Sequence, residues 1–220
     1  MSVALLRGES LLVEERGEPG RSAAEALLPA VDACLAAARL GLSEVEAFAV
    51  SIGPGSFTSL RVGVATLKGL AFGATSPVVA VPTLEALVHG APEGAGQGEV
   101  VAMLDARRGE VYAAGFLAGA PRLPEGVYTV DELAARVRPP CLLIGDGVEI
   151  CGGELVSRLG SGVALVPAPM GVPSAGHVGV LGARRLAAGE GIPAAEVVPR
   201  YVRRAQAEVV RTGERFEAGR

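Results

Sequence analysis

The residues best placed to do chemistry lie in a glycine-rich turn that follows an apolar segment. Residues 47–52 are typical of a buried strand, and Gly53-Pro54-Gly55-Ser56-Phe57-Thr58 follows it directly. Glycine lets the backbone turn sharply, Pro54 stiffens the turn, and Ser56 or Thr58 can cap a following helix. The free amide groups at such a helix start can bind an anion. The same pattern also fits a capped turn that binds nothing, and the local sequence leaves both hypotheses open.

Other side chains could form a catalytic site, but their spacing gives little support. Ser56, His177 and Asp105 could form a hydrolase triad, yet the G-x-S-x-G pattern is absent around Ser56. Asp105 could bind a metal ion or cap the turn at Arg107, and we favour the capping role. Arg107 could reach an anion such as a nucleotide, or it could simply be solvated, as exposed arginines in hairpin turns usually are. His89 and His177 are far apart in the sequence and are not spaced as metal ligands.

The cysteines indicate no disulfide framework and no zinc site. Cys34, Cys141 and Cys151 are an odd number, and no C-x-x-C pair is present. Cys34 is expected on a helix, where it acts as a small apolar residue. This usage fits a reduced cytoplasm.

The elements that would position these residues alternate between short strands and helices, which predicts an α/β fold. A capping box at Ser22 and Glu25 starts the first helix, Asp131 could cap a later one, and Ser174 starts the last. The Gly- and Pro-rich residues 90–98 are the best linker, so we expect an N-terminal lobe at 1–98 and a C-terminal lobe at 99–220. The expected strands are 2–6, 11–14, 47–52, 78–81, 100–105, 111–117 and 141–144, and the expected helices are 23–39, 59–72, 82–88, 131–138, 149–159 and 175–188.

Composition limits the classes of function. Hydrophobic residues make up 50% of the 220 residues, which is enough for a sizeable core, and the net charge is -4. A protein that grips nucleic acid unaided needs a clustered basic face, so we expect any RNA role to depend on a partner. No apolar run is long enough to span a membrane, and the start lacks the pattern of a signal peptide. We therefore expect a soluble, cytoplasmic protein.

Longer stretches resemble the TsaB family. Residues 51–63 are similar to the family signature, which usually reads G-P-G-S-F-T-G-L-R-I-G, with Ser59 in place of a glycine. Three further stretches agree in order and spacing, at 26–29, 105–112 and 199–203. The resemblance implies a two-lobed actin-like ATPase and sugar-kinase (ASKHA) fold. It also implies a role as a scaffold subunit that works with the catalytic protein TsaD and the ATPase TsaE to make threonylcarbamoyladenosine at position 37 of tRNA.

The resemblance further implies where partners bind. The first two long helices would dock TsaD, or a second copy of this chain when TsaD is absent, and tRNA would be reached through the complex. ATP or ADP would bind at the complex junction, with none held by the chain alone. The implied docking residues are Ala23, Leu27, Ala30, Cys34, Leu60, Val64 and Leu67. The implied nucleotide and TsaE junction comprises Gly53, Pro54, Gly55, Ser56, Phe57, Thr58, Arg61 and Arg107.

The resemblance also argues against catalysis. TsaD-type enzymes hold a metal through a helical H-x-x-x-H, and the equivalent positions here are Thr83 and Leu87. Leucine has no donor atom, so we expect no such metal site and no enzyme activity. A metal-dependent peptidase or acyl-transfer hydrolase, and an ATP-dependent small-molecule kinase, remain alternatives. Family members also begin with a strand carrying L-A-x-D-T-S, which is absent before Val3. Two hypotheses stay open: the start codon was placed too late, or the sheet lacks this strand.

Overall fold

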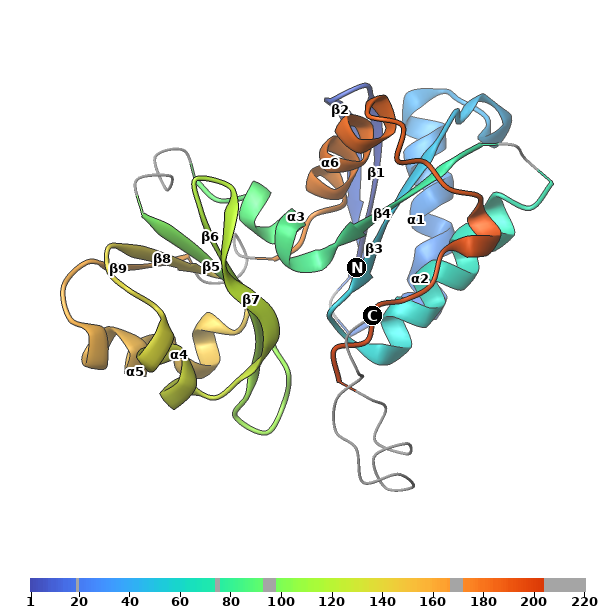
Figure 1. Ribbon diagram of the computed structural model, residues 1–220. Coiled ribbons are helices and arrows are strands. Elements are labelled where there is room, and N and C mark those ends of the chain that lie inside the picture. The colour runs from blue at the N-terminus through green and yellow to red at the C-terminus, as the bar shows by residue number, and fades with distance from the viewer. Residues whose placement is uncertain (19, 74–75, 93–97, 167–171, 204–220) are drawn as a thin grey trace. The chain divides into compact units, whose positions relative to one another are not determined.

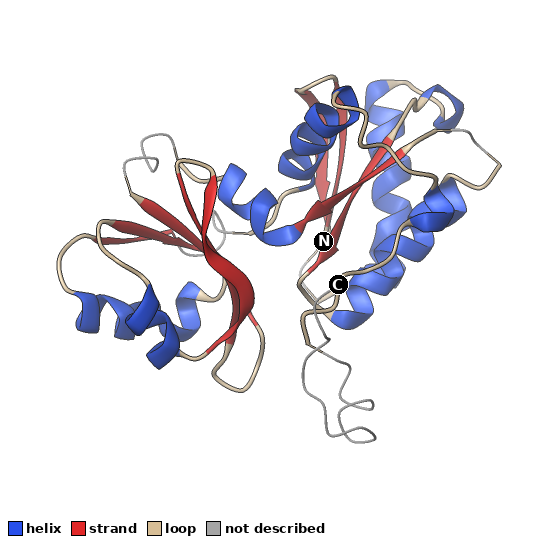
Figure 2. Cartoon of the chain, viewed as in Figure 1, coloured by secondary structure: helices blue, strands red, loops and turns tan. Residues whose placement is uncertain are grey.

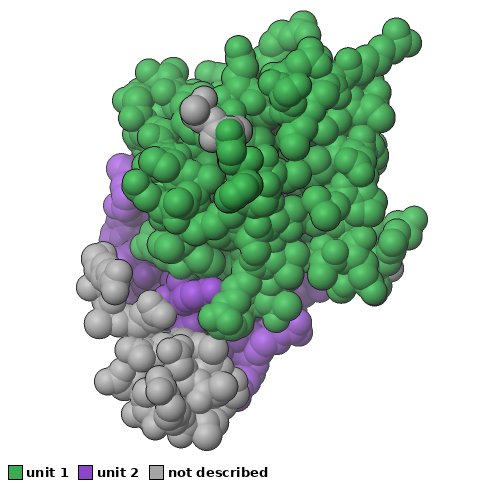
Figure 3. All heavy atoms as spheres, turned by 90° about the vertical axis from the view of Figure 1, so that its right-hand side faces the viewer, with its two compact units in different colours: residues 1–86, 174–200 green, residues 87–173, 201–220 purple. Residues whose placement is uncertain are grey.

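The computed structural model describes residues 1–18, 20–73, 76–92, 98–166 and 172–203 of a mixed α/β chain (Figure 1). It divides into two compact units, drawn in separate colours in Figure 3. Unit 1 comprises residues 1–86 and 174–200, and unit 2 comprises residues 87–173 and 201–220. The sequence predicted a division between residues 98 and 99. The structure differs because residues 174–200 return to the N-terminal unit, and a linear sequence carries no signal for such a return.

Unit 1 begins with an antiparallel hairpin that carries the first long helix. Strand β1 (Ser2–Arg7) pairs with β2 (Ser10–Arg16), and α1 (Ala23–Ala38) packs on both. The predicted capping box is present, since the Glu25 carboxylate accepts hydrogen bonds from the Ser22 backbone N–H at 3.2 Å and the Ser22 hydroxyl at 2.8 Å. The helix runs on through Pro29.

A parallel pair of strands forms the second part of unit 1. Strand β3 (Phe48–Gly53) leads into α2 (Phe57–Leu70), β4 (Val78–Pro82) pairs with β3, and α3 (Thr83–His89) follows at once. A short 3-10 helix, η1 (Leu42–Glu44), precedes β3. Parallel strands need a crossover connection, and α2 supplies it. Val64 and Leu67 of α2 pack with Val78 and Val197 in one core cluster.

Helix α6 (Ala175–Ala187) completes unit 1 and is followed by the 3-10 helix η3 (Ala194–Glu196). The predicted cap is confirmed, because Ser174 Oγ accepts a hydrogen bond from the Gly176 N–H at 3.1 Å. Helix α6 lies against β1, β3 and β4 (Figure 1). A Cβ at Gly179 would lie 2.4 Å from Leu6 Cδ1, and one at Gly182 would lie 2.5 Å from the Ala49 Cβ. Glycine at these positions therefore allows the helix to approach the strands closely.

Unit 2 is a five-stranded mixed sheet with the strand order β7-β6-β5-β8-β9. Helices α4 and α5 lie on one side of it (Figure 2). Buried Leu133 of α4 and Leu155 of α5 pack with Met103 and Leu143 of the sheet. The elements are β5 (Glu99–Asp105), β6 (Val111–Leu117), β7 (Ala120–Tyr128), α4 (Val130–Arg136), β8 (Cys141–Ile144), α5 (Val148–Leu159) and β9 (Val163–Val166).

Two details of unit 2 differ from the sequence prediction. Strands β7 and β9 were not predicted, because β7 contains Pro121 and Pro124 and β9 has four residues. Proline is tolerated in β7 because this strand is at the edge of the sheet. The predicted cap at Asp131 is wrong: Thr129 Oγ1 accepts the hydrogen bond from the Glu132 N–H at 3.3 Å, so α4 starts earlier and ends at Arg136.

The predicted linker at 90–98 falls in part on residues 93–97, which lie outside the described residues. Among the helices that the structure does describe, none combines the length and the apolar character needed to cross a membrane.

Candidate functional site

The glycine-rich turn after β3 is held against a late segment of unit 1. Gly53 has a φ of 122°, which only glycine adopts readily, and a Cβ there would lie 2.4 Å from the Arg200 carbonyl oxygen. The Arg200 N–H in turn donates a hydrogen bond to the Ile52 carbonyl at 2.7 Å. The signature turn and the later stretch that contains Arg200 are therefore in backbone contact.

The residues after the turn form the start of α2. Ser56 is the cap, and its Oγ accepts hydrogen bonds from the Ser59 N–H at 3.4 Å and the Ser59 hydroxyl at 3.2 Å. Of the two predicted caps, Ser56 is confirmed, and Thr58 is a residue of the helix itself. One turn further on, the Arg61 guanidinium lies 3.9 Å from the centre of the Phe57 ring. This cation–π contact fixes a positive charge beside the start of α2.

A pair of hydroxyl groups lies where the two parallel strands of unit 1 end. Ser51 Oγ and Thr83 Oγ1 are 2.6 Å apart, so one of them donates a hydrogen bond to the other. Thr83 is buried at the start of α3, and Leu87 is buried in the same helix. Thr83 and Leu87 are the two positions that the family resemblance assigned to the histidine ligands of TsaD-type enzymes. Thr83 is hydrogen bonded to Ser51, and Leu87 is an apolar core residue.

The predicted docking residues divide into two groups. Ala23, Leu27, Ala30 and Leu60 are partly exposed. Cys34, Val64 and Leu67 are only 2%, 5% and 7% exposed and belong to the core of unit 1. Cys34 Sγ donates to the Val3 carbonyl at 3.4 Å. These three side chains face their own unit, because the apolar side of each helix packs inward, and the surface of the helices is made by other residues.

We give the name α1–α2 surface to six of the exposed residues that lie in or just after these two helices. The helices contact each other, so their outward residues lie on neighbouring elements (Figure 1). Leu28 is 51% exposed and Phe72, just after α2, is 90% exposed. Ala24, Ala65 and Gly69 are small, which leaves room for another backbone to approach. The α1–α2 surface comprises Ala24, Leu28, Arg61, Ala65, Gly69 and Phe72.

In unit 2, Arg107 lies in a tight turn between β5 and β6. The Asp105 carboxylate accepts a hydrogen bond from the Arg107 N–H at 2.6 Å and pairs with its guanidinium at 3.2 Å, so the predicted capping role is confirmed. Arg107 and Arg108 both have positive φ, at 66° and 62°, which is uncommon for residues with a side chain. Arg203, from a later segment of the chain, stabilises the turn. Its guanidinium pairs with Glu110 and donates a hydrogen bond to the Ala106 carbonyl at 2.7 Å.

The buried thiols of unit 2 are poor nucleophiles. Burial, with a smaller contribution from Glu99, raises the pKa of Cys141 to about 11, and burial with Glu154 does the same for Cys151. Burial also raises the pKa of Cys34 in unit 1. A thiol that stays protonated at neutral pH has little nucleophilic or metal-binding capacity.

Comparison with known proteins agrees with this architecture. A model of the TsaD family, described as tRNA N6-adenosine threonylcarbamoyltransferase, matches residues 18–135. The solved structure of YeaZ from Pseudomonas aeruginosa has a TM-score of 0.73 and 32% identity, covering 91% of this chain and 93% of that chain. These matches place the chain among actin-like ATPase-type proteins related to TsaD.

Two curated relatives are both named tRNA threonylcarbamoyladenosine biosynthesis protein TsaB. The one from Escherichia coli (strain K12) is 31% identical over 192 residues, which cover 83% of this chain and 81% of that protein. The one from Haemophilus influenzae is 46% identical over 112 residues. That match covers 50% of this chain and 47% of the relative, so this chain spans about half the length of that relative. The chain belongs to the TsaB family, also called YeaZ.

Proposed function

We propose that the chain is a non-catalytic subunit of the machinery that makes threonylcarbamoyladenosine in tRNA, where it binds TsaD and helps to recruit TsaE. Its place in the TsaB family, whose curated members are named for that biosynthesis, supports the general role. One observation carries the non-catalytic part of the proposal. The two positions that correspond to metal-binding histidines of TsaD-type enzymes are Thr83, hydrogen bonded to Ser51, and Leu87, which is buried.

The chemistry of the remaining side chains supports the same proposal. Asp105 already neutralises Arg107 and accepts a hydrogen bond from its backbone, which occupies the carboxylate that a catalytic triad would need. Ser56 Oγ is used as a helix cap. A hydroxyl group needs an adjacent general base to act as a nucleophile.

The α1–α2 surface is the proposed site for TsaD. Helices pack closely when small residues let the backbones approach and larger apolar residues fill the gaps between them. Ala24 and Ala65 provide the small residues, while Leu28 and Phe72 provide the exposed apolar ones. In the absence of TsaD, we propose that a second copy of this chain occupies the same surface.

The proposed contacts for TsaE and for ATP or ADP within the complex are the turn at residues 53–58 with Arg61 in unit 1 and, separately, Arg107 in unit 2. The start of α2 offers backbone N–H groups, and Arg61 is held beside it by Phe57. Both features favour a negatively charged group. The isolated chain is expected to hold no nucleotide by itself.

Substitution of Leu28 by glutamate tests the docking proposal. We expect Leu28→Glu to weaken co-purification with TsaD by at least about 10-fold, because a buried apolar contact becomes a buried charge. Leu11→Glu is the matched control, since Leu11 is 52% exposed on β2 and Leu28 is 51% exposed on α1. Modification of a tRNA transcript by a reconstituted mixture of the chain, TsaD, TsaE and the adenylate-forming enzyme should fall in parallel.

The proposal fails if the wild-type chain does not bind TsaD at micromolar concentration, or if both substitutions have equal effects. The hydrolase alternative is tested on the isolated chain with a peptidase assay and metal analysis. Turnover that depends on a stoichiometric bound metal would replace the scaffold proposal by an enzyme.

A further inference from the structure

Three arginines of unit 2 line one surface pocket. Its volume is about 330 Å³, and its walls are Arg122, Leu123, Pro124, Arg136 and Arg138. Arg122 comes from the edge strand β7, while Arg136 and Arg138 come from the end of α4 and the segment after it. All three arginines are exposed, and Leu123 is buried beneath them.

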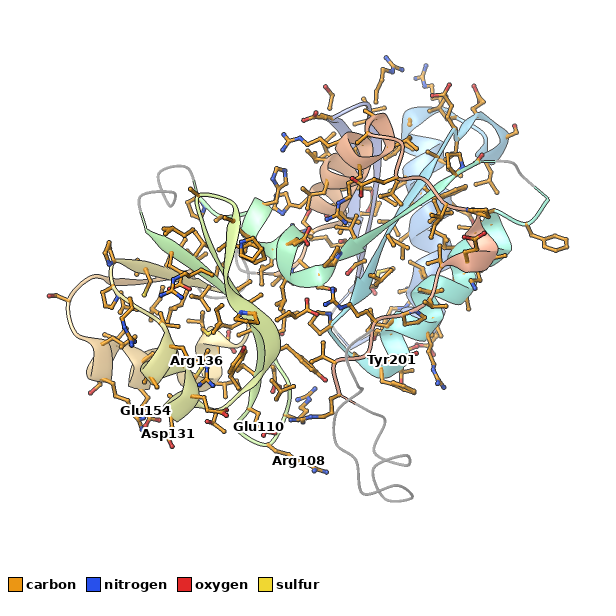
Figure 4. All side chains as sticks on the ribbon, viewed as in Figure 1. Arg108, Glu110, Asp131, Arg136, Glu154 and Tyr201 are labelled. Atoms are coloured by element: carbon orange, nitrogen blue, oxygen red, sulfur yellow. The ribbon has the colours of Figure 1, made fainter. Side chains whose placement is uncertain are left out.

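The neighbouring carboxylates of α4 are occupied elsewhere. Glu132 accepts hydrogen bonds from the N–H and hydroxyl of Thr129, at 2.9 and 3.1 Å, as part of the helix cap. Asp131 pairs with Arg158, which also pairs with Glu154. Figure 4 labels Asp131 and Glu154, the two carboxylates that Arg158 joins, together with Arg136. Hydrogen bonds from Thr129 lower the pKa of Glu132, and the nearby Arg136 contributes to this shift, so Glu132 is satisfied mainly by the helix cap.

In the part of the chain that the structure describes, the guanidinium groups of the pocket form no ion pair within 4.0 Å. Arg138 Nη1 donates to the Val137 carbonyl at 2.9 Å, and Arg136 Nη1 donates to the Glu132 carbonyl at 3.4 Å. Arg136 also lies 5.7 Å from the centre of the Tyr128 ring. Each guanidinium has five N–H donors, so these bonds leave most donors available.

We propose that this pocket binds phosphate groups of the tRNA backbone. The inference rests on the proposed function, which supplies RNA as the substrate. Arginine forms paired hydrogen bonds with phosphate oxygens, and several like charges in one pocket repel each other unless an anion neutralises them. RNA bases can also stack on an aromatic side chain or on the plane of an arginine guanidinium.

The structure favours a polymeric phosphate over a small enclosed ligand. The donors are long, exposed side chains from two elements, and they form an open surface rather than a cradle of backbone N–H groups. The net charge of -4 predicts that the rest of the surface repels RNA. Binding by the isolated chain is therefore local, weak and strongly salt-dependent, and it adds to the contacts that TsaD makes in the complex.

The test uses the full chain and a fluorescently labelled tRNA transcript, with binding measured by anisotropy at several salt concentrations. We expect the triple variant R122Q/R136Q/R138Q to lose about 10-fold or more in affinity at low salt. The plot of log K against log salt should become shallower, with the magnitude of its slope smaller by about 2. Each lost phosphate contact reduces that magnitude by roughly 0.7 to 0.9. The control is R7Q/R21Q/R39Q, which changes the net charge equally at exposed arginines of unit 1. It should keep the wild-type slope.

A second variant separates binding from a structural role. R122K/R136K/R138K keeps the charges and should keep most of the salt slope, although it loses the planar fork of donors. The thermal midpoint of the glutamine variant should equal or exceed that of the wild type, because like charges are removed. Equal loss in both glutamine triples, or no RNA binding by the wild-type chain at low salt, overturns the inference.

Binding to TsaD is measured on the same proteins by co-purification. If the glutamine variant binds TsaD and also binds RNA as the wild type does, the pocket inference fails and the proposed function stands. If the wild type does not bind TsaD, the proposed function fails, and the RNA titration still decides whether the pocket binds phosphate.

Discussion

Replacement of Gly53 by alanine probes the contact between the signature turn and the segment that contains Arg200. The φ of 122° is a conformation that residues with a Cβ avoid, which costs about 1–3 kcal/mol. The new Cβ would lie 2.4 Å from the Arg200 carbonyl oxygen, and a backbone atom cannot rotate away. If the segment moves, the hydrogen bond from the Arg200 N–H to the Ile52 carbonyl is lost, at about 1 kcal/mol. The expected loss of unfolding free energy is therefore about 2–4 kcal/mol.

Chemical denaturation followed by circular dichroism measures this loss, with Gly8→Ala as the matched control. Gly8 also has a positive φ, at 58°, but a Cβ there would have no neighbour within 4 Å. Gly8→Ala should cost about 1 kcal/mol, from backbone strain alone. If Gly53→Ala is no more destabilising than Gly8→Ala, the close approach to Arg200 does not constrain the turn, and the reasoning is refuted.

Two further predictions concern the packing of α6 and its cap. Gly182→Ala should destabilise the chain by about 1 kcal/mol, because overpacking against Ala49 outweighs the gain in helix propensity. A Cβ at Gly153 in α5 would have no neighbour within 4 Å, so Gly153→Ala should stabilise the chain by up to about 1 kcal/mol. A gain in stability in both variants would contradict the close packing of α6. Burial alone would raise the pKa of Glu14, but hydrogen bonds from Ser174 and from a backbone N–H of α6 hold this pKa below its ordinary value. A lowered pKa contributes stability that is present above about pH 4.3, the ordinary value, and is lost as the pH falls through the lower folded value. Denaturation curves at several acidic pH values should therefore show a weaker pH dependence for Glu14→Gln than for the wild type, and identical curves would exclude this contribution.

The sequence predicted most elements because their signals are local. The capping box at Ser22 and the cap at Ser174 each depend on hydrogen bonds within a few residues. Strand β7 was missed because Pro121 and Pro124 are unfavourable in a strand, and only its edge position in the sheet makes them tolerable.

For the candidate site, the sequence predicted the roles of single residues but not which side chains are exposed or lie together. Ser56 as the cap of α2 and Asp105 as the acceptor in the turn at Arg107 follow from residue type and position. The sequence alone did not show which side of each helix is buried in its own unit. Cys34, Val64 and Leu67 lie on that buried side, although they were assigned to a docking surface. The sequence carries no motif for the arginine pocket, because Arg122 and Arg136 are brought together only by the packing of α4 near β7.

By itself, the sequence determined the α/β class, the family signature and the capping box at Ser22, since these follow from residue identity and local spacing. The tertiary structure decided the return of α6 to unit 1, the contact of Gly53 with Arg200 and the arginine pocket of unit 2. The physical reason is the same in each case. Close backbone approach and the burial of one helix face depend on which distant segment lies opposite, and that is set by packing of the whole unit.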